Sequence, residues 1–304
     1  MNASLATLAA LWLLLSLPGS AAAQAPDAKA AAEQTVFEQA RLAALNGPAE
    51  VPLAKQALLK LPPGHAFVPQ PHATRLLNAM GNPGQDAKLQ GLIFPQEPGA
   101  GWFMTVRFED AGHVKDDDAR DWNADELLQS YRDGTEAANE ERQKLGAPAL
   151  EILGWAEKPA YDAATHRLVW AMSSREKGAP AGQPQGVNYN TYVLGREGYF
   201  SLNLVTGLAE LPAHKGAAHA LLDALQFDEG KRYADFNAST DRVAEYGLAA
   251  LVVGVAAKKL GFIAVAGVFI AKFAKVILLS LGLLGAGAVR LFKGRKAKAT
   301  PPAP

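Results

Sequence analysis

Three adjacent aspartates, Asp116, Asp117 and Asp118, stand between a predicted strand and a predicted helix in the segment HVKDDDARDW. Neighbouring carboxylates can share one Mg²⁺ or Ca²⁺ ion, because hard cations bind oxygen ligands. They can also accept hydrogen bonds from the unpaired backbone N–H groups at the start of a helix, where the helix dipole favours negative charge. Lys115 and Arg120 lie beside them and relieve their mutual repulsion. Of these roles for the three aspartates, we expect a structural one in the turn before the others. A weak metal or ligand site is the second expectation, and acid–base catalysis is the third.

Two further polar sets belong to the most distinctive strings of the sequence. They are Glu136, Asn139 and Arg142 in a predicted helix, and Asn188, Tyr189, Arg196 and Glu197 along a predicted hairpin. Arginine and paired carboxylates can hold a polar or anionic ligand, so a ligand or partner surface is expected at these residues if a pocket exists. The main alternative gives them hydrogen-bonded roles in the turn and on the helix surface.

Complete catalytic motifs are absent from the sequence. It contains no G-x-S-x-G, H-E-x-x-H, P-loop or Rossmann glycine pattern. Ser174 and Lys177 fit the S-x-x-K spacing of serine acyl enzymes, but no partner motif accompanies them. The chain has no cysteine, which excludes disulfides, thiol nucleophiles and cysteine-ligated zinc. The six histidines are scattered and are expected on the surface. We predict no catalytic residue and no cofactor, and we lean against an enzyme.

Predicted strands and helices alternate along residues 34–240, and these elements must position the polar groups. The expected strands, rich in β-branched and aromatic residues, are 50–54, 91–94, 102–109, 149–156, 166–173, 187–195 and 199–206. The expected helices are 71–80, 124–145 and 213–225. LGREGYF predicts a tight hairpin, and GWAEKPAYDAATHRLVW predicts a second one with a longer loop through Pro159, Tyr161 and Asp162. Strands joined this closely must be antiparallel. The predicted fold is α+β, a mainly antiparallel sheet flanked by helices, followed by a C-terminal membrane helix or helical hairpin.

Charge is distributed unevenly along the 304 residues. The thirty basic and thirty acidic residues balance, yet no Asp or Glu follows Glu245. The nine basic residues beyond that point therefore leave a formal charge of about −9 on the preceding chain. Such a body repels a nucleic-acid backbone, and no basic, aromatic-interleaved surface is evident. We expect no nucleic-acid partner.

The N-terminus has the pattern of a secretory signal. An apolar run from Leu5 to Leu17 is followed by a Pro18-Gly19 break and by small residues at Ala21 and Ala23. We expect cleavage after Ala23, so that residues 1–23 form a signal peptide and residues 24–48 a linker with a short N-terminal helix. An uncleaved anchor or a buried helix is the alternative.

The C-terminal region predicts membrane association. Residues 241–292 are expected to form membrane-associated helices, and the best span is 273–292, where Lys275 and Arg290 are close enough to the ends to snorkel. The preceding apolar stretch carries Lys258 and Lys259 at its middle, each costing about 3 kcal/mol in a bilayer. It is a second span or an interfacial helix, and a buried hairpin in a soluble core is the remaining alternative. We favour one crossing, which leaves the basic, disordered tail 293–304 in the cytoplasm.

Several long strings also resemble a known family. They are HVKDDDARDW, GTEAANEER, LGWAEKPAYD, VNYNTYVLGREGY, RYADFN and DRVAEYGLAALVVGVAAKKLG. In this order they resemble the bacterial family of uncharacterised membrane-anchored proteins called domain of unknown function 2167, from about Ala49 to the basic tail. The resemblance implies an exported body with a membrane anchor and no established activity. The order of elements is also similar to the antiparallel α/β/α sandwiches of photosystem-P-like proteins, an analogy of fold alone.

Three functional hypotheses follow from these observations. The first is an envelope protein of the bacterial inner membrane, whose periplasmic α+β domain (49–240) binds an unknown envelope protein or ligand while the C-terminal segment contacts the lipid bilayer. The second is a carboxylate-dependent envelope enzyme centred on Asp116 to Asp118, which acts with or without the assistance of a metal. The third is a membrane-structural protein whose two apolar segments pack through small residues.

Overall fold

The computed structural model describes residues 25–253 except 83, 98, 121, 145 and 181. The predicted signal peptide 1–23, the best span 273–292 and the basic tail 293–304 therefore lie outside the described residues. Among the helices of the described part, none combines the length and apolar character that crossing a bilayer requires.

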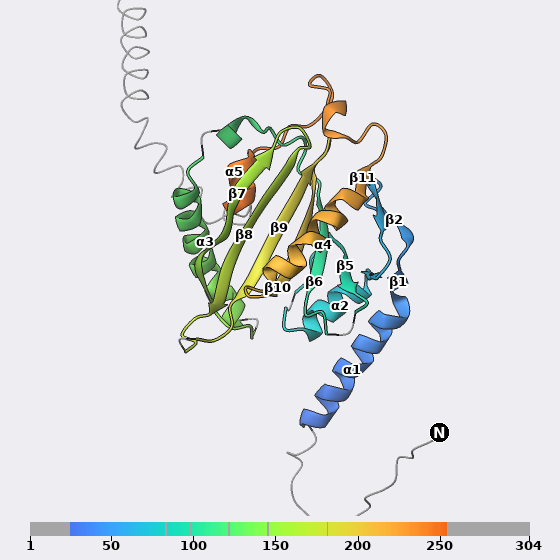
Figure 1. Cartoon of the computed structure of the whole chain (residues 1–304), viewed down its shortest axis with the longest axis vertical. Coiled ribbons are helices and arrows are strands. Elements are labelled where there is room, and N and C mark those ends of the chain that lie inside the picture. The colour runs from blue at the N-terminus through green and yellow to red at the C-terminus, as the bar shows by residue number, and fades with distance from the viewer. Residues whose placement is uncertain are drawn as a thin grey trace, which may run out of the picture.

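A large antiparallel sheet forms the centre of the molecule, as predicted (Figure 1). Its eight strands, in spatial order, are β1 (Leu45–Asn46), β4 (His65–Pro69), β5 (Leu89–Pro95), β6 (Phe103–Glu109), β10 (Tyr199–Gly207), β9 (Gly186–Leu194), β8 (Arg167–Glu176) and β7 (Leu150–Asp162). The β9–β10 pairing confirms the tight hairpin expected from LGREGYF. The mixed α+β class and the flanking helices are confirmed as well.

The second hairpin differs from its prediction in the length of its loop. β7 continues through Pro159 to Asp162, so that the loop before β8 is much shorter than expected. Register shifts occur in this strand, the last of them between Glu157 and Ala160. Such bulges absorb extra residues without ending the strand, and a proline is tolerated there because β7 is an edge strand.

The largest apolar core lies on one face of the sheet. We call this face the α4 face. It is covered by α4 (Leu211–Ala224) and by a second sheet in the order β11 (Leu225–Phe227), β3 (Ala57–Leu61) and β2 (Ala49–Leu53). Phe200, Leu202 and Leu204 of β10 point into this core and are fully buried. Burying each such side chain stabilises the fold by about 1.5–3 kcal/mol.

The opposite face carries two separate apolar clusters. One lies over β4 and β5 beneath α1 (Ala25–Ala43) and α2 (His72–Ala79). The other lies over β7 and β8 beneath α3 (Ala124–Lys144) and α5 (Leu248–Val253), and it contains the buried Trp170. The 19-residue α1 occupies the region where a linker and a short helix were expected, and its alanine-rich sequence favours a helix. Between the two clusters, the middle parts of β6, β10 and β9 present polar side chains on this face.

Helix α3 runs beside the outer edge of the sheet (Figure 1). Arg132 donates hydrogen bonds to the backbone oxygens of Ile152 and Leu153. Asn139 accepts from the backbone nitrogen of Leu150 at 2.8 Å and donates to its oxygen at 2.9 Å. These contacts occupy backbone groups at the start of β7, where another chain could otherwise add a strand.

Candidate functional site

The three adjacent aspartates point to different partners. Asp116 accepts a hydrogen bond from the hydroxyl of Tyr161 at 2.8 Å. Asp117 is exposed at the start of a short 3-10 helix, η1 (Asp117–Arg120). Asp118 accepts from the backbone nitrogens of Leu248 and Ala249 at 2.9 and 3.1 Å. In this arrangement the carboxylates cannot share one cation, and the described residues hold no group of three or more His, Cys, Asp or Glu suited to a metal ion.

Asp118 acts as the helix cap that the sequence allowed, but for a distant helix. It binds the first N–H groups of α5, 130 residues further along the chain. Leu248, Leu251 and Val252 of α5 are fully buried against the sheet. Gly247 is needed at the junction, because a Cβ there would lie 2.5 Å from an oxygen of Asp118. The start of the predicted membrane region, 241–292, is thus docked on the domain as far as the described residues extend.

Beside Asp116, four rings form a stack that no sequence motif predicts. Phe236 stacks on His113 at 3.9 Å between ring centroids, His113 lies 4.2 Å from Tyr233, and Tyr233 lies 4.1 Å from His166. Tyr233 begins a second 3-10 helix, η2 (Tyr233–Asp235), and donates to the backbone oxygen of Val114. The stack therefore holds the connection to α5 against the end of β6.

A short hydrogen-bond relay joins this stack. The hydroxyl of Tyr161 donates to Asp116 and lies 3.2 Å from Nδ1 of His166. Since that hydroxyl hydrogen is already used, Nδ1 of His166 is the donor in the second contact. Burial, and then the hydrogen bond to Asp116, raise the pKa of Tyr161 well above its usual range. The relay orients His166 and keeps Tyr161 protonated.

His113 contradicts the expectation that all histidines lie on the surface. Its side chain is 7% exposed, and its Nδ1 has no hydrogen-bond partner within the described part of the chain. Burial lowers its pKa from 6.5, although Asp116 and Asp241 favour the protonated form; His166 and Lys115 oppose protonation further. Folding therefore favours the neutral form of His113.

Acidification is expected to destabilise the domain through His113. Its folded pKa is depressed, so the unfolded chain binds the proton more readily and stability falls as pH drops below the unfolded pKa of about 6.5. His113→Phe keeps the ring stack but removes the titrating group. It should flatten the pH dependence of the free energy of unfolding between about pH 7.5 and 5.5. Urea unfolding at several pH values measures this. A variant that retains the slope of the parent would contradict the assignment.

Arg196 and Glu197 lie at the same end of the sheet as the stack. Arg196 forms a bidentate pair with Asp241 at 2.7 and 2.8 Å, which lowers the pKa of that carboxyl far below its usual range. Glu197 binds Lys231 and the amide of Gln56. Both residues therefore tie the β9–β10 turn to the chain that leads into α5.

The other sequence-predicted residues are dispersed. Glu136 pairs with Lys177 on the surface, and Asn139 is engaged by the edge of β7. Tyr189 points into the α4 face, where its hydroxyl lies 2.8 Å from Nε2 of His219. Asn188 lies on the opposite face, and Arg142 reaches a cavity there. The seven residues do not form one site.

The middle of the sheet face opposite α4 carries a set of polar residues that we call the polar strip. Its members come from neighbouring strands and are Thr105 and Arg107 of β6, Ser201 and Asn203 of β10, and Asn188, Asn190 and Tyr192 of β9.

Strand register places these residues side by side. Asn203 pairs with Thr105 on one side and Asn190 on the other, and Ser201 pairs with Arg107 and Tyr192. Residues paired across strands share a face, so the row of Thr105, Asn203 and Asn190 crosses three strands without an apolar member. The row of Arg107 and Ser201 ends on Tyr192, which packs against the apolar cluster under α3 and α5. The strip separates the apolar cluster under α2 from the one under α3 and α5. Thr105, Ser201 and Asn190 are themselves buried, so the strip offers little accessible surface of its own.

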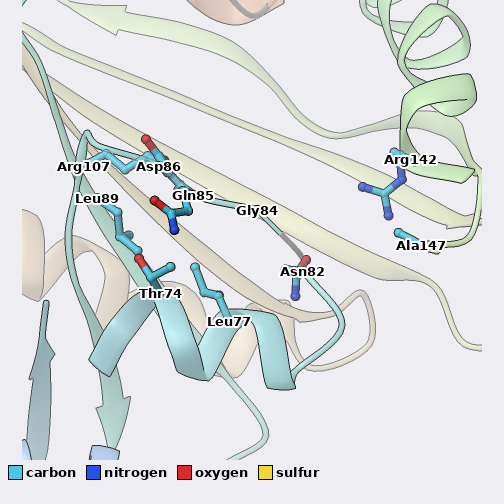
Figure 2. A pocket seen from close by; sticks show the side chains of 10 residues that line it. All are labelled: Thr74, Leu77, Asn82, Gly84, Gln85, Asp86, Leu89, Arg107, Arg142 and Ala147. Atoms are coloured by element: carbon cyan, nitrogen blue, oxygen red, sulfur yellow. The ribbon is translucent and has the colours of Figure 1, made fainter. Parts of the chain in front are cut away.

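A cavity of about 260 Å³ lies at one side of the polar strip. Its lining comprises Thr74, Leu77, Asn82, Gly84, Gln85, Asp86, Leu89, Arg107, Arg142 and Ala147. Figure 2 shows α2 and its following loop on one side, with Arg142 and Ala147 across from them at the end of α3. Arg107 is neutralised by Asp86 at 2.6 Å. Arg142 binds only the backbone oxygen of Pro148, and no carboxylate among the described residues pairs with it.

Sequence reasoning found Arg142 and Asn188 but missed the rest of this region. The alternation in VNYNTYVL indicates one polar face of β9, a signal that was available. The partners on β6 and β10 depend on strand order and register, which no local pattern specifies. Asn82 and residues 84–86 follow α2, and their place beside the cavity follows only from the tertiary structure.

Comparisons with known proteins give the family of the chain. No curated protein matches it. Among solved structures, the solution structure of cyanobacterial PsbP (CyanoP) from Synechocystis sp. PCC 6803 is similar with a TM-score of 0.37 and 9% identity, over 59% of this chain and 92% of that one. A family model described as protein of unknown function (DUF2167) matches residues 45–282, and the chain therefore belongs to this family.

Proposed function

We propose that this protein is a membrane-tethered envelope protein whose exported α+β domain binds a small ligand or partner at the cavity beside the polar strip. The domain sits in the periplasm, the C-terminal segment contacts the lipid bilayer of the inner membrane, and the basic tail lies in the cytoplasm. Nucleic acid is not among its partners.

The observation that carries the binding role is the cavity between α2 and α3. It combines an arginine without an acidic partner in the described chain, amide and hydroxyl side chains, and two leucines. A few convergent polar groups in a partly apolar concavity are typical of ligand sites. Glu136 lines a second cavity of about 360 Å³, but it is paired with Lys177 there, and Arg132 beside it binds the backbone of β7. The cavity at Arg142 is therefore the better supported place for binding.

The tethering role is supported from two sides. The sequence provides a secretory pattern at one end and the 273–292 apolar stretch at the other. In the folded domain, Asp118 and the buried face of α5 hold the start of the predicted membrane-associated region 241–292.

Alkaline phosphatase fusions test this placement, because that enzyme forms its disulfides only outside the cytosol. A fusion after Val253 is expected to be active in cells, and a fusion after Pro304 inactive. A matched fusion after Val253 that lacks residues 2–23 should be inactive. Inactivity of the first fusion would refute export, and activity at both positions would replace one crossing by a hairpin.

A further inference from the structure

The cavity beside the polar strip is built to receive negative charge. Arg142 uses Nε to donate to the backbone oxygen of Pro148 at 3.0 Å, which leaves its two terminal nitrogens without a partner in the described part of the chain. Figure 2 shows its guanidinium extending from the end of α3 toward Asn82. A guanidinium offers paired N–H groups that match a carboxylate or a phosphate.

The charges around Arg142 do not cancel its own. Arg107 and Asp86 in the lining form an ion pair with each other, and Lys88 just outside pairs with Glu109. The lining therefore has one uncompensated positive charge, on a body whose formal charge is about −9. A cationic concavity on an acidic surface favours an anionic ligand small enough to avoid the surrounding repulsion.

The rest of the lining fits a hydroxylated ring. Asn82, Gln85 and Thr74 provide amide and hydroxyl groups. Thr74 donates its hydroxyl hydrogen to Gln70, so it can only accept a further hydrogen bond, and Asn82 donates one amide hydrogen to the backbone oxygen of Met80. Leu77 and Leu89 form the apolar part, against which the C–H face of a sugar ring can pack. The volume of about 260 Å³ lies just below the roughly 300–1,000 Å³ of typical ligand pockets, which suits a monosaccharide-sized molecule.

We propose that this cavity binds a monosaccharide-sized ligand that carries one anionic group, a carboxylate or a phosphate, held by Arg142. This inference rests on the proposed function, since it names the ligand class of the same site. Carboxylated and phosphorylated sugars share the chemistry that Arg142 recognises, so the test must compare both.

Isothermal titration calorimetry on the purified full-length chain in mild detergent tests the proposal with three probes. They are N-acetylmuramic acid, N-acetylglucosamine 6-phosphate and the neutral N-acetylglucosamine. At least one charged sugar should bind at least about tenfold more tightly than the neutral one, since charge-assisted hydrogen bonds are about twice as strong as neutral ones. The better of the two charged probes identifies the anionic group.

Two variants locate the anion contact. Arg142→Gln keeps a donor for Pro148 but removes the charge, and it should abolish the preference for the charged sugar. Lys144→Gln removes a charge from the exposed end of the same helix and should leave binding unchanged. If Arg142→Gln fails to fold, the salt dependence of wild-type binding replaces it, because an anion contact weakens as ionic strength rises.

Equal binding of charged and neutral sugars, unchanged binding in Arg142→Gln, salt-independent binding of a charged sugar, or no heat with any probe at millimolar concentration would each overturn the proposal. The fusion experiment separates these outcomes from failure of the proposed function. If the fusions report an exported domain and no sugar binds, the ligand class alone is wrong.

Discussion

Gly198→Ala is expected to destabilise the domain by about 3 kcal/mol, at the upper end of the range for overpacking. A Cβ at this position would lie 1.9 Å from the backbone oxygen of Glu109 and 2.9 Å from its carbonyl carbon. Both are main-chain atoms of the central strand β6, so no flexible side chain can move aside. The β9–β10 turn would have to separate from the end of β6, where Glu197 accepts a hydrogen bond from the backbone nitrogen of Gly112.

The measurement is thermal unfolding followed by tryptophan fluorescence. At roughly 2–4 °C per kcal/mol for a domain of this size, the midpoint should fall by about 6–12 °C. Gly216→Ala is the matched control, because nothing lies within 4 Å of its added Cβ in the middle of α4. That control should be neutral or stabilising by up to about 1 kcal/mol. A Gly198→Ala midpoint within 2 °C of the parent would contradict the close packing of this turn.

The turn around Gly198 illustrates what the sequence could reveal. LGREGYF predicts a tight turn between two strands, since Gly follows two polar residues between alternating apolar ones, and the structure confirms it. Tertiary contacts explain why these residue types occur in the turn. Arg196 binds Asp241, Glu197 binds Lys231, and Gly198 lies against β6. A local pattern predicts the hairpin, whereas the partners 30 to 45 residues away depend on how the chain returns.

The missed strands have a related cause. β3 and β4 are 5 residues each, with apolar runs such as ALLKL that fit a helix as well as a strand. Their pairing with β2 and β5 decides between the two, because a strand gains stability only from its neighbours. By contrast, β8, β9 and β10 are 9 or 10 residues long and rich in β-branched and aromatic residues, and all three were predicted.

The candidate site was predictable only in part, for a physical reason. Asp116, Asp117 and Asp118 attract attention because they are adjacent, yet adjacency along an irregular segment sends successive side chains in different directions. The ring stack of His113 and Tyr233 joins residues 120 positions apart and leaves no trace in local spacing. Arg142 could be identified as a candidate, but its lack of an acidic partner in the described chain depends on which helix end meets which loop.

Asn139→Leu is expected to destabilise the domain by about 2–4 kcal/mol, because it leaves two backbone groups without a partner. Asn139 is 5% exposed, and its amide binds both the N–H and the C=O of Leu150. The amide takes the place of a neighbouring strand at the edge of β7. Leucine has a similar size and can fill the volume, but it can neither donate nor accept.

Hydrogen exchange measures the loss of the Asn139 contact directly at the backbone amide of Leu150. The amide of Leu150 should be protected in the parent and should exchange much faster in Asn139→Leu, together with a lower midpoint of thermal unfolding. Gln143→Leu places the same side chain on an exposed position one turn further along α3 and should change stability by less than about 0.5 kcal/mol. If the amide of Leu150 stays protected in the Asn139 variant, water or a shifted α3 binds the backbone groups of Leu150. The side chain of Asn139 would then not be what protects this edge of β7. Loss of protection only at Leu150 and its neighbours would instead show that a single amide on α3 shields this edge of the sheet from added strands.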